Sequence, residues 1–417
     1  MKLRIFAFQL GIGTLLAQLI SLSFLPLITR IFPPSEYGKF TLIISITSMV
    51  LPLATLRIET SLLVDSTHER VKRESKLAVF STLIVGAFIS PIILIFLMSI
   101  KQLRFVESIE FSILFLITLI FQMLMVIMIH VNLMNGKYIK VAYSGVIQNL
   151  MIGLNQFLLS RIKPSGTLLA LGFIFGKFFG LIPLLKTFTK IDHAEVASRR
   201  SLFRQVKSKI SENRFLISTS ILEGALISLP IIASGLLYGI QFSGYIGLAQ
   251  TVLTVPITLI AGSVGSVVLS EFSYFKKIGL PLKQSLTTAF LHFFKPLTGA
   301  TIAFIVSILF FGDEIFGFFL ATEWNESIHL MKWLAVPFAI NFMWIPFNNV
   351  LLAERAWRTL SMISSIRLLL SSTSAFVFFV TEFNWIVVAF SFFTAGSLVQ
   401  LISMTLFINR GLSKTQH

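Results

Sequence analysis

Long stretches of the chain are apolar at nearly every position, so that no helical face is left polar; residues 112–130 are one example. A helix needs about 20 apolar residues to cross the hydrocarbon core of a bilayer, which is about 30 Å thick. Runs of that length recur down the chain. They predict twelve membrane spans, at 8–30, 40–64, 77–100, 109–131, 143–160, 167–189, 215–238, 244–270, 289–311, 328–352, 359–381 and 384–408.

The fifth of these spans is the least apolar, because it carries Gln148, Asn149, Asn155 and Gln156. We expect it to pack inside the bundle or to tilt. A transmembrane barrel would instead show short segments of alternating polarity. The pattern therefore predicts an all-α polytopic membrane protein.

Composition agrees with this class, since 55% of the 417 residues are hydrophobic, 12% are charged and the mean hydropathy is +0.87. The chain has no cysteine, which excludes thiol catalysis, disulfides and thiolate metal sites. The histidines are too scattered to predict a metal site, and no phosphate-binding loop motif occurs. We expect no cofactor.

Positive charges are distributed unevenly between the two sides of the predicted spans. With the amino terminus in the cytoplasm, about 23 of the 34 Lys and Arg residues fall in cytoplasmic segments and about six on the other side. This bias predicts that both termini are cytoplasmic and accounts for most of the net charge of +16. No segment is long enough for a soluble basic domain, so we expect no binding of nucleic acid.

Two pairs of prolines repeat at one offset. Leu25-Pro26 matches Leu229-Pro230, and Leu51-Pro52-Leu53 matches Val255-Pro256-Ile257, both 204 residues later. The repeat predicts two six-helix lobes, residues 1–190 and 214–417, related by a pseudo-two-fold axis along the membrane normal. Proline inside a span removes a backbone hydrogen bond, so these four prolines are hinge candidates, although they can equally be plain architecture.

The lobes are expected to be joined by a basic, amphipathic cytoplasmic linker at 191–213. Within and around it, apolar residues recur at helical spacing among arginines and lysines. That pattern suits a helix lying on anionic membrane lipids, and the alternative is a solvated basic linker.

Five charged residues inside the spans are the candidates for function, because each central charge costs about 2.5–3.5 kcal/mol on insertion scales and normally faces a partner or a watery cavity. Arg57, Lys177 and Arg367 would form a cationic site for an anionic headgroup; Glu223 and Glu59 could carry a coupling ion. Alternatively, Arg57 pairs with Glu223 as a structural lock, and the other charges are structural.

Two segments carry a family resemblance: Thr-Arg-x-Phe-Pro-Pro-x-Glu-Tyr-Gly at 29–38 and Leu-Arg-Ile-Glu at 56–59. Together with residues 213–272 and 321–351, they resemble the oligosaccharide (O-antigen and polysaccharide) flippases. These form the polysaccharide-transport branch of the multidrug/oligosaccharidyl-lipid/polysaccharide exporter superfamily.

The resemblance implies a flippase in the bacterial inner membrane that moves an undecaprenyl-pyrophosphate-linked sugar unit to the outer leaflet, coupled to protons or sodium, in support of lipopolysaccharide or other surface polysaccharide biosynthesis. It also implies a cationic cavity containing Arg57, and a polysaccharide polymerase and a chain-length regulator as partners. The alternatives are a cation-coupled multidrug exporter, which the surplus of Arg and Lys disfavours, and a polysaccharide polymerase. A polymerase would need a sizeable external loop that we do not expect here, so we expect a transporter and not an enzyme.

Overall fold

The computed structural model describes residues 2–57, 91, 109–188, 199–255, 282–353 and 356–412. These residues form an all-helical membrane protein whose contacts divide into two compact units, Met1–Gly244 and Tyr245–His417. Nine of the described helices are long and apolar enough to cross a membrane. The predicted third span, 77–100, lies outside the described residues apart from Pro91, and the count of twelve spans and the six-plus-six division stay predictions.

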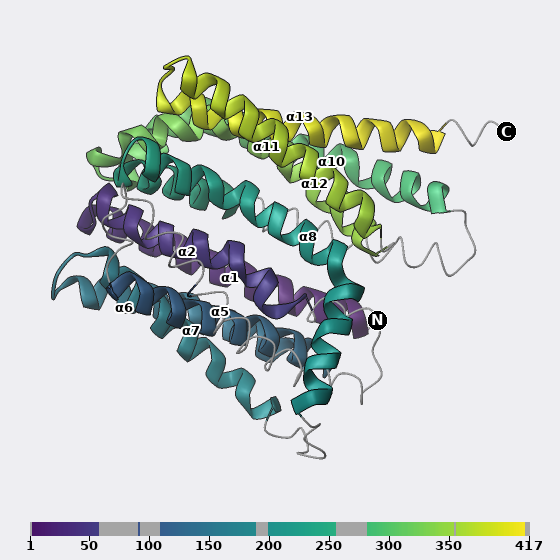
Figure 1. Ribbon diagram of the computed structural model, residues 1–417. Coiled ribbons are helices and arrows are strands. Elements are labelled where there is room, and N and C mark those ends of the chain that lie inside the picture. Colours follow the sequence, from purple (N-terminus) through teal and green to yellow (C-terminus); the bar gives the residue numbers. More distant parts are fainter. Residues whose placement is uncertain are drawn as a thin grey trace. The chain divides into compact units, whose positions relative to one another are not determined.

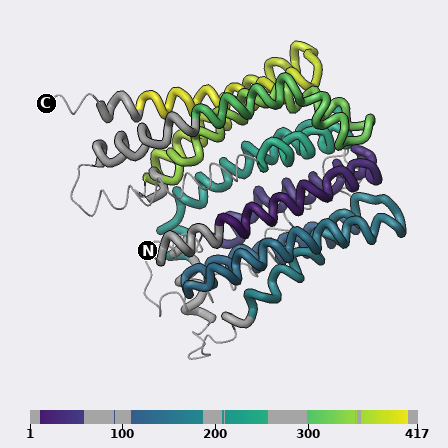
Figure 2. The backbone as a smooth tube through the Cα atoms, turned by 180° about the vertical axis from the view of Figure 1, so that it is seen from behind, coloured from purple at the N-terminus to yellow at the C-terminus, as the bar shows by residue number. Residues whose placement is uncertain are grey.

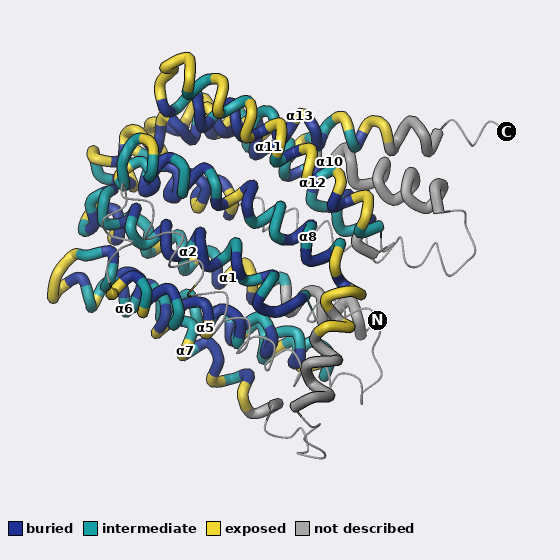
Figure 3. Tube along the Cα trace, in the orientation of Figure 1, coloured by how far each residue is buried: buried dark blue, intermediate teal, exposed yellow. Residues whose placement is uncertain are grey.

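The described residues of the first unit form six long helices (Figure 1). They are α1 (Lys2–Ile31), α2 (Pro34–Thr55), α5 (Ile109–Met134), α6 (Tyr138–Ser160), α7 (Gly166–Phe188) and α8 (Arg199–Leu237). Helix α6 packs against α1 and α7, and α2 contacts α5, α7 and α8. Since α2 is the most buried of these spans, it forms the centre of the unit (Figure 3).

The second unit contains α10 (Leu282–Phe319), the short 3₁₀ helix η1 (Thr322–Trp324), α11 (Asn325–Ala353), α12 (Trp357–Val380) and α13 (Trp385–Leu412). Helix α13 packs against both α11 and α12, and α10 packs against α11. Most of helix 240–255 belongs to this unit as well, and Tyr245 on it contacts the rings of Trp324 and Trp385.

Helix α6 is too polar to be among the nine candidate spans, and its position explains how the chain accommodates it. Gly172, Gly176 and Gly180 recur every fourth residue of α7, so one face of α7 lets the backbone of α6 approach closely. A Cβ atom on Gly176 would lie only 2.7 Å from the backbone nitrogen of Ile152. The amide of Gln156 donates across the interface to the carbonyl of Leu169 at 3.1 Å. The expectation that this span packs within the bundle fits these contacts.

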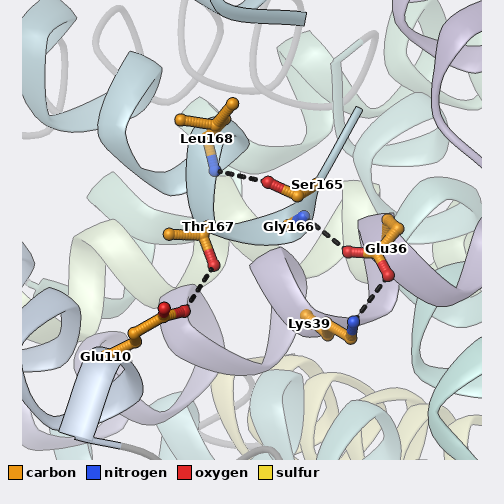
Figure 4. A network of polar contacts seen from close by, with 7 residues as sticks. All are labelled: Glu36, Lys39, Glu110, Ser165, Gly166, Thr167 and Leu168. Atoms are coloured by element: carbon orange, nitrogen blue, oxygen red, sulfur yellow. Dashed lines mark hydrogen bonds and ion pairs between the residues drawn. The ribbon is translucent and has the colours of Figure 1, made fainter. Parts of the chain in front are cut away.

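The segment at 29–38 builds the corner between α1 and α2. Phe32 is buried, Pro33 is extended, and α2 begins at Pro34, where a missing N–H costs nothing. Glu36 then reaches out of α2: its Oε2 accepts from the backbone N–H of Gly166 at 2.8 Å, and its Oε1 pairs with Lys39 at 2.5 Å (Figure 4). A carboxylate of α2 thus satisfies and neutralises the amino-terminal end of α7.

The start of α2 also meets the chain just after α8. A Cβ atom on Gly38 would overlap the carbonyl oxygen of Ile240, and one on Gly244 would overlap that of Pro34. Thr41 Oγ1 donates to the carbonyl of Ser243 at 3.2 Å. The backbones of α2 and of residues 240–244 therefore touch here, at two glycines and the Thr41 hydroxyl.

Two expectations about local structure are corrected. The second span was predicted to run to residue 64, but α2 ends at Thr55 because Leu56 and Arg57 take left-handed backbone angles. The predicted spans 289–311 and 328–352 leave residues 312–327 between them, but α10 continues to Phe319 and η1 and α11 follow almost at once. The basic residues from Arg199 onward belong to the same helix as the following span, α8, which changes direction along its length (Figures 1 and 2).

Candidate functional site

The candidate site is organised by the break at the end of α2. Leu56 and Arg57 both have φ of 52°, a region that costs a residue with a side chain about 1–2 kcal/mol. The side chain of Leu56 is 3% exposed and packs in an apolar cluster with Val131, Leu184 and Ile217. Burial of this leucine holds the strained turn in place, and the turn directs Arg57 away from the path that a continuing helix would take.

Helix α8 holds the break by two hydrogen bonds. The side-chain amide of Asn213 donates to the carbonyl of Leu56 at 3.1 Å. The Nε of Arg57 donates to Ser220 Oγ at 2.5 Å, and Ser220 Oγ donates in turn to the carbonyl of Leu216 at 2.8 Å. Asn213 and Ser220 are seven residues apart, which puts them on one face of α8. This face fixes both the backbone of the break and the direction of the guanidinium group.

The rest of that interface is made of small residues. Ser220, Gly224 and Ser228 recur every fourth residue of α8, and Ser228 Oγ donates to the carbonyl of Ser45 at 2.9 Å. A Cβ atom on Gly224 would lie 3.5 Å from the Cα atom of Met49, which is an ordinary contact. Close approach through small residues is typical of helix pairs in membranes.

Glu223, one of the two predicted coupling carboxylates, lies beside this interface. It is half-buried and three residues beyond Ser220, so it shares the side of α8 that contacts Arg57. Glu59, the other candidate, lies outside the described residues.

Three of the four hinge prolines are inside described helices: Pro26 in α1, Pro52 in α2 and Pro230 in α8. Pro256 lies outside the described residues. Pro52 precedes the break by one turn and has no N–H to offer the carbonyl of Ser48. Gly224 of α8 faces that carbonyl, with a Cβ position 3.6 Å away. Of the three hinge candidates that the structure describes, Pro52 is thus the one beside the site.

Lys177 lies in the middle of α7, half-buried, with Nζ 5.1 Å from the centre of the Phe173 ring. Phe173 in turn contacts Phe40 of α2 edge to face, with 6.0 Å between ring centres. Among the described residues, Lys177 forms no ion pair. Residues 40–55, 111–129 and 141–160 of the neighbouring helices contain no charged side chain. Its ammonium group is therefore a mid-span charge supported by an aromatic face.

Arg367 belongs to the second unit, where it is 7% exposed on α12. Its guanidinium lies 6.0 Å from the centre of the Trp344 ring, and Ser364 and Ser371 are buried on the same side of α12. In the same group of helices, Gln400 of α13 donates to Asn341 of α11 at 3.0 Å. Arg367 thus sits in a polar seam inside its unit, whereas Arg57 and Lys177 belong to the first unit.

Sequence reasoning identified the charges but missed the uncharged residues that place them. Asn213 and Ser220 were not singled out, although their seven-residue spacing at the start of an otherwise apolar span is a readable signal. The role of Glu36 could not be read from the sequence, because its partner Gly166 is 130 residues away.

Comparison with known structures defines the fold. The chain is similar to the lipid II flippase MurJ in an inward closed conformation, with a TM-score of 0.70 and 17% identity over 95% of this chain and 87% of that one. It is also similar to an outward-facing MATE multidrug transporter of the MOP superfamily (TM-score 0.63, 13% identity, 99% and 96% covered). The Vibrio cholerae MATE transporter VcmN, in a substituted form, gives a TM-score of 0.62 at 12% identity, with 99% and 98% covered.

The chain has the MATE and MurJ fold. These structural neighbours are transporters and not enzymes. No protein-family model matches the sequence, and the curated proteins include no match. At these identities the likeness defines the architecture and leaves the substrate to be argued from the site.

Proposed function

We propose that the protein is a flippase that moves an undecaprenyl-pyrophosphate-linked oligosaccharide, the repeat unit of O-antigen or another surface polysaccharide, across the bacterial inner membrane by alternating access. The two lobes, residues 1–190 and 214–417, would carry the motion, with both termini in the cytoplasm. The fold shared with a lipid flippase and with multidrug exporters supports a transporter, and the charge of the site favours the lipid-linked anion.

The observation that carries the proposal is the fixed guanidinium at the end of α2. Arginine presents a planar fork of donors that stays charged and matches phosphate oxygens in pairs. The bond from Arg57 to Ser220 orients that plane relative to α8, and the buried Leu56 holds the strained turn behind it. A pre-oriented donor loses less entropy when it binds a ligand.

Lys177 adds a second positive charge in the same unit. A charge in mid-span with an aromatic contact and no ion pair among the described residues is costly unless an anion or water meets it. In this proposal Lys177 meets the pyrophosphate as a point charge. Arg367 is proposed as a third contact from the second unit, and Glu223 or Glu59 as the carrier of a coupling ion.

The experiment is flipping of fluorescent undecaprenyl-pyrophosphate oligosaccharide in proteoliposomes, with proton and sodium gradients imposed in turn. Arg57→Ala should lower the flipping rate at least tenfold. Arg161→Ala is the matched control, because Arg161 is an exposed arginine of the same unit whose guanidinium lies over the Phe157 ring. It should flip at the wild-type rate.

Two outcomes would overturn the proposal. Normal flipping by Arg57→Ala at matched protein levels would remove the site from the mechanism. Export of organic cations without flipping of the lipid would assign the chain to the multidrug-exporter function instead.

A further inference from the structure

Two buried side-chain oxygens lie next to the break in α2 without hydrogen-bond partners among the described residues. They are Oγ1 of Thr55 and Oδ1 of Asn213. Both residues have 0% exposed surface. A buried polar atom that forms no hydrogen bond costs about 1–3 kcal/mol, so two such oxygens at one turn call for a ligand.

The backbone places further oxygens at the same point. Helix α2 ends at Thr55, and the carbonyl groups of a last helical turn point beyond the helix end and carry its negative partial charge. Asn213 donates its Nδ2 to the carbonyl of Leu56, and this bond holds the amide Oδ1 beside the same break. The amide oxygen of Asn213 thus lies beside main-chain carbonyl oxygens where the helix stops, next to the residue that carries the Thr55 hydroxyl.

We propose that this turn is a sodium site, with Thr55 Oγ1, Asn213 Oδ1 and main-chain carbonyls at the end of α2 as ligands. Hard cations prefer oxygen ligands, and the ends of interrupted membrane helices bind sodium through their carbonyl groups. The oxygens named are all uncharged, which suits a monovalent ion better than a divalent one. No group of three or more His, Asp or Glu side chains in the described part of the chain offers a divalent metal site.

The site also connects an ion to the anion-binding residue. Leu56 lies between Thr55 and Arg57 and accepts the Asn213 bond, so an ion bound here stabilises the left-handed turn that directs Arg57 toward Ser220. Sodium should then raise the affinity for the anionic substrate, and by linkage the substrate should raise the affinity for sodium. This coupling rests on the proposed function, whereas sodium binding itself does not.

The test is thermal unfolding of the purified full-length protein without substrate, in sodium, potassium or choline chloride at constant ionic strength. An ion that binds the folded state raises the unfolding midpoint along a saturating curve. We expect such a curve for sodium, with a much weaker response to potassium and none to choline. A bridging water would give the same midpoint in all three salts and would overturn the proposal.

Three variants assign the response to the turn. Thr55→Val removes the hydroxyl at nearly constant volume and should weaken the apparent sodium affinity at least tenfold, while Thr55→Ser should keep the response. Thr118→Val is the matched control: Thr118 is also fully buried with an unpartnered hydroxyl, but it lies in α5, 13 residues from the Val131 that packs against Leu56. Its sodium curve should match the wild type.

A sodium response that survives in Thr55→Val would contradict the site. If Thr55→Val fails to fold, protection of the backbone amides of residues 50–57 from hydrogen exchange by sodium in the wild type decides the question. Neither readout needs the lipid substrate. A protein that binds sodium at this turn but flips no lipid-linked sugar would therefore overturn the proposed function and leave the ion site standing.

Discussion

The Nε of Arg57 donates to the hydroxyl of Ser220 at 2.5 Å, although the two residues are 163 positions apart in the chain. This bond joins the end of α2 to α8 at the one described turn where two consecutive residues with side chains adopt positive φ. It ties the position of a charged side chain to the packing of two helices, so the energetics of the turn can be tested separately from transport.

Removing the hydroxyl should affect ligand binding more than stability. In Ser220→Ala the Nε of Arg57 loses its acceptor, and a hydrogen bond of a charged group contributes about 1.5–3 kcal/mol, less when it is partly exposed as here. We expect the unfolding midpoint to fall by a few degrees and the Kd for the lipid-linked substrate to rise about tenfold. Unchanged affinity in a folded Ser220→Ala protein would show that the orientation of Arg57 is unimportant.

The strain at Leu56 predicts that glycine is more stable than alanine at this position, which is the reverse of their order in an ordinary helix. In an ordinary helix, glycine is about 0.5–1 kcal/mol less stable than alanine, but at φ of 52° glycine avoids the Cβ penalty. Leu56→Ala and Leu56→Gly both remove the buried side chain, so their difference isolates the backbone. We expect Leu56→Gly to be about 1 kcal/mol more stable than Leu56→Ala in denaturant unfolding. The opposite order would mean that the turn is not left-handed.

Lys177 should show opposite effects on stability and function. Lys177→Met removes a mid-span charge that has no ion pair among the described residues and fills the space with an apolar chain of similar length. We expect the free energy of unfolding to rise by about 1–2 kcal/mol and flipping to fall. Lys332→Met is the control, since Lys332 pairs with Asp313 and its loss should not stabilise the protein. A destabilised Lys177→Met would indicate a structural role instead.

The backbone contact at Gly38 predicts a large effect from one methyl group. Gly38→Ala would place a Cβ against the carbonyl of Ile240, and overpacking of this kind typically costs about 1–3 kcal/mol. Gly11→Ala in α1 meets no atom within 4 Å and should be neutral or slightly stabilising, because alanine favours helix. Equal unfolding midpoints for the two variants would contradict the contact between α2 and the segment after α8.

Apolar run length predicted most of the helices, because the requirement to cross a bilayer acts on each segment alone. The predicted span 359–381 and α12, Trp357–Val380, differ by at most two residues at either end. The prediction was wrong where local angles override hydropathy: Leu56 is apolar and gave no sign that α2 would end before it.

The charged residues of the candidate site were also readable from the sequence, because charged residues are rare in membrane spans. Their partners were not. The acceptor of Arg57 and the residue that holds its backbone, Ser220 and Asn213, are ordinary polar residues about 160 positions away, and no periodicity links them to α2. Such pairings depend on how helices pack, which the sequence of one helix does not specify.

The most direct test of the account compares two ligands that differ by one phosphate. The affinities of wild type and Arg57→Ala would be measured for undecaprenyl-pyrophosphate oligosaccharide and for the undecaprenyl-monophosphate sugar in nanodiscs. The account predicts that wild type prefers the pyrophosphate by at least tenfold and that Arg57→Ala loses this preference while keeping its affinity for the monophosphate. An equal preference in both proteins would show that Arg57 does not recognise the pyrophosphate.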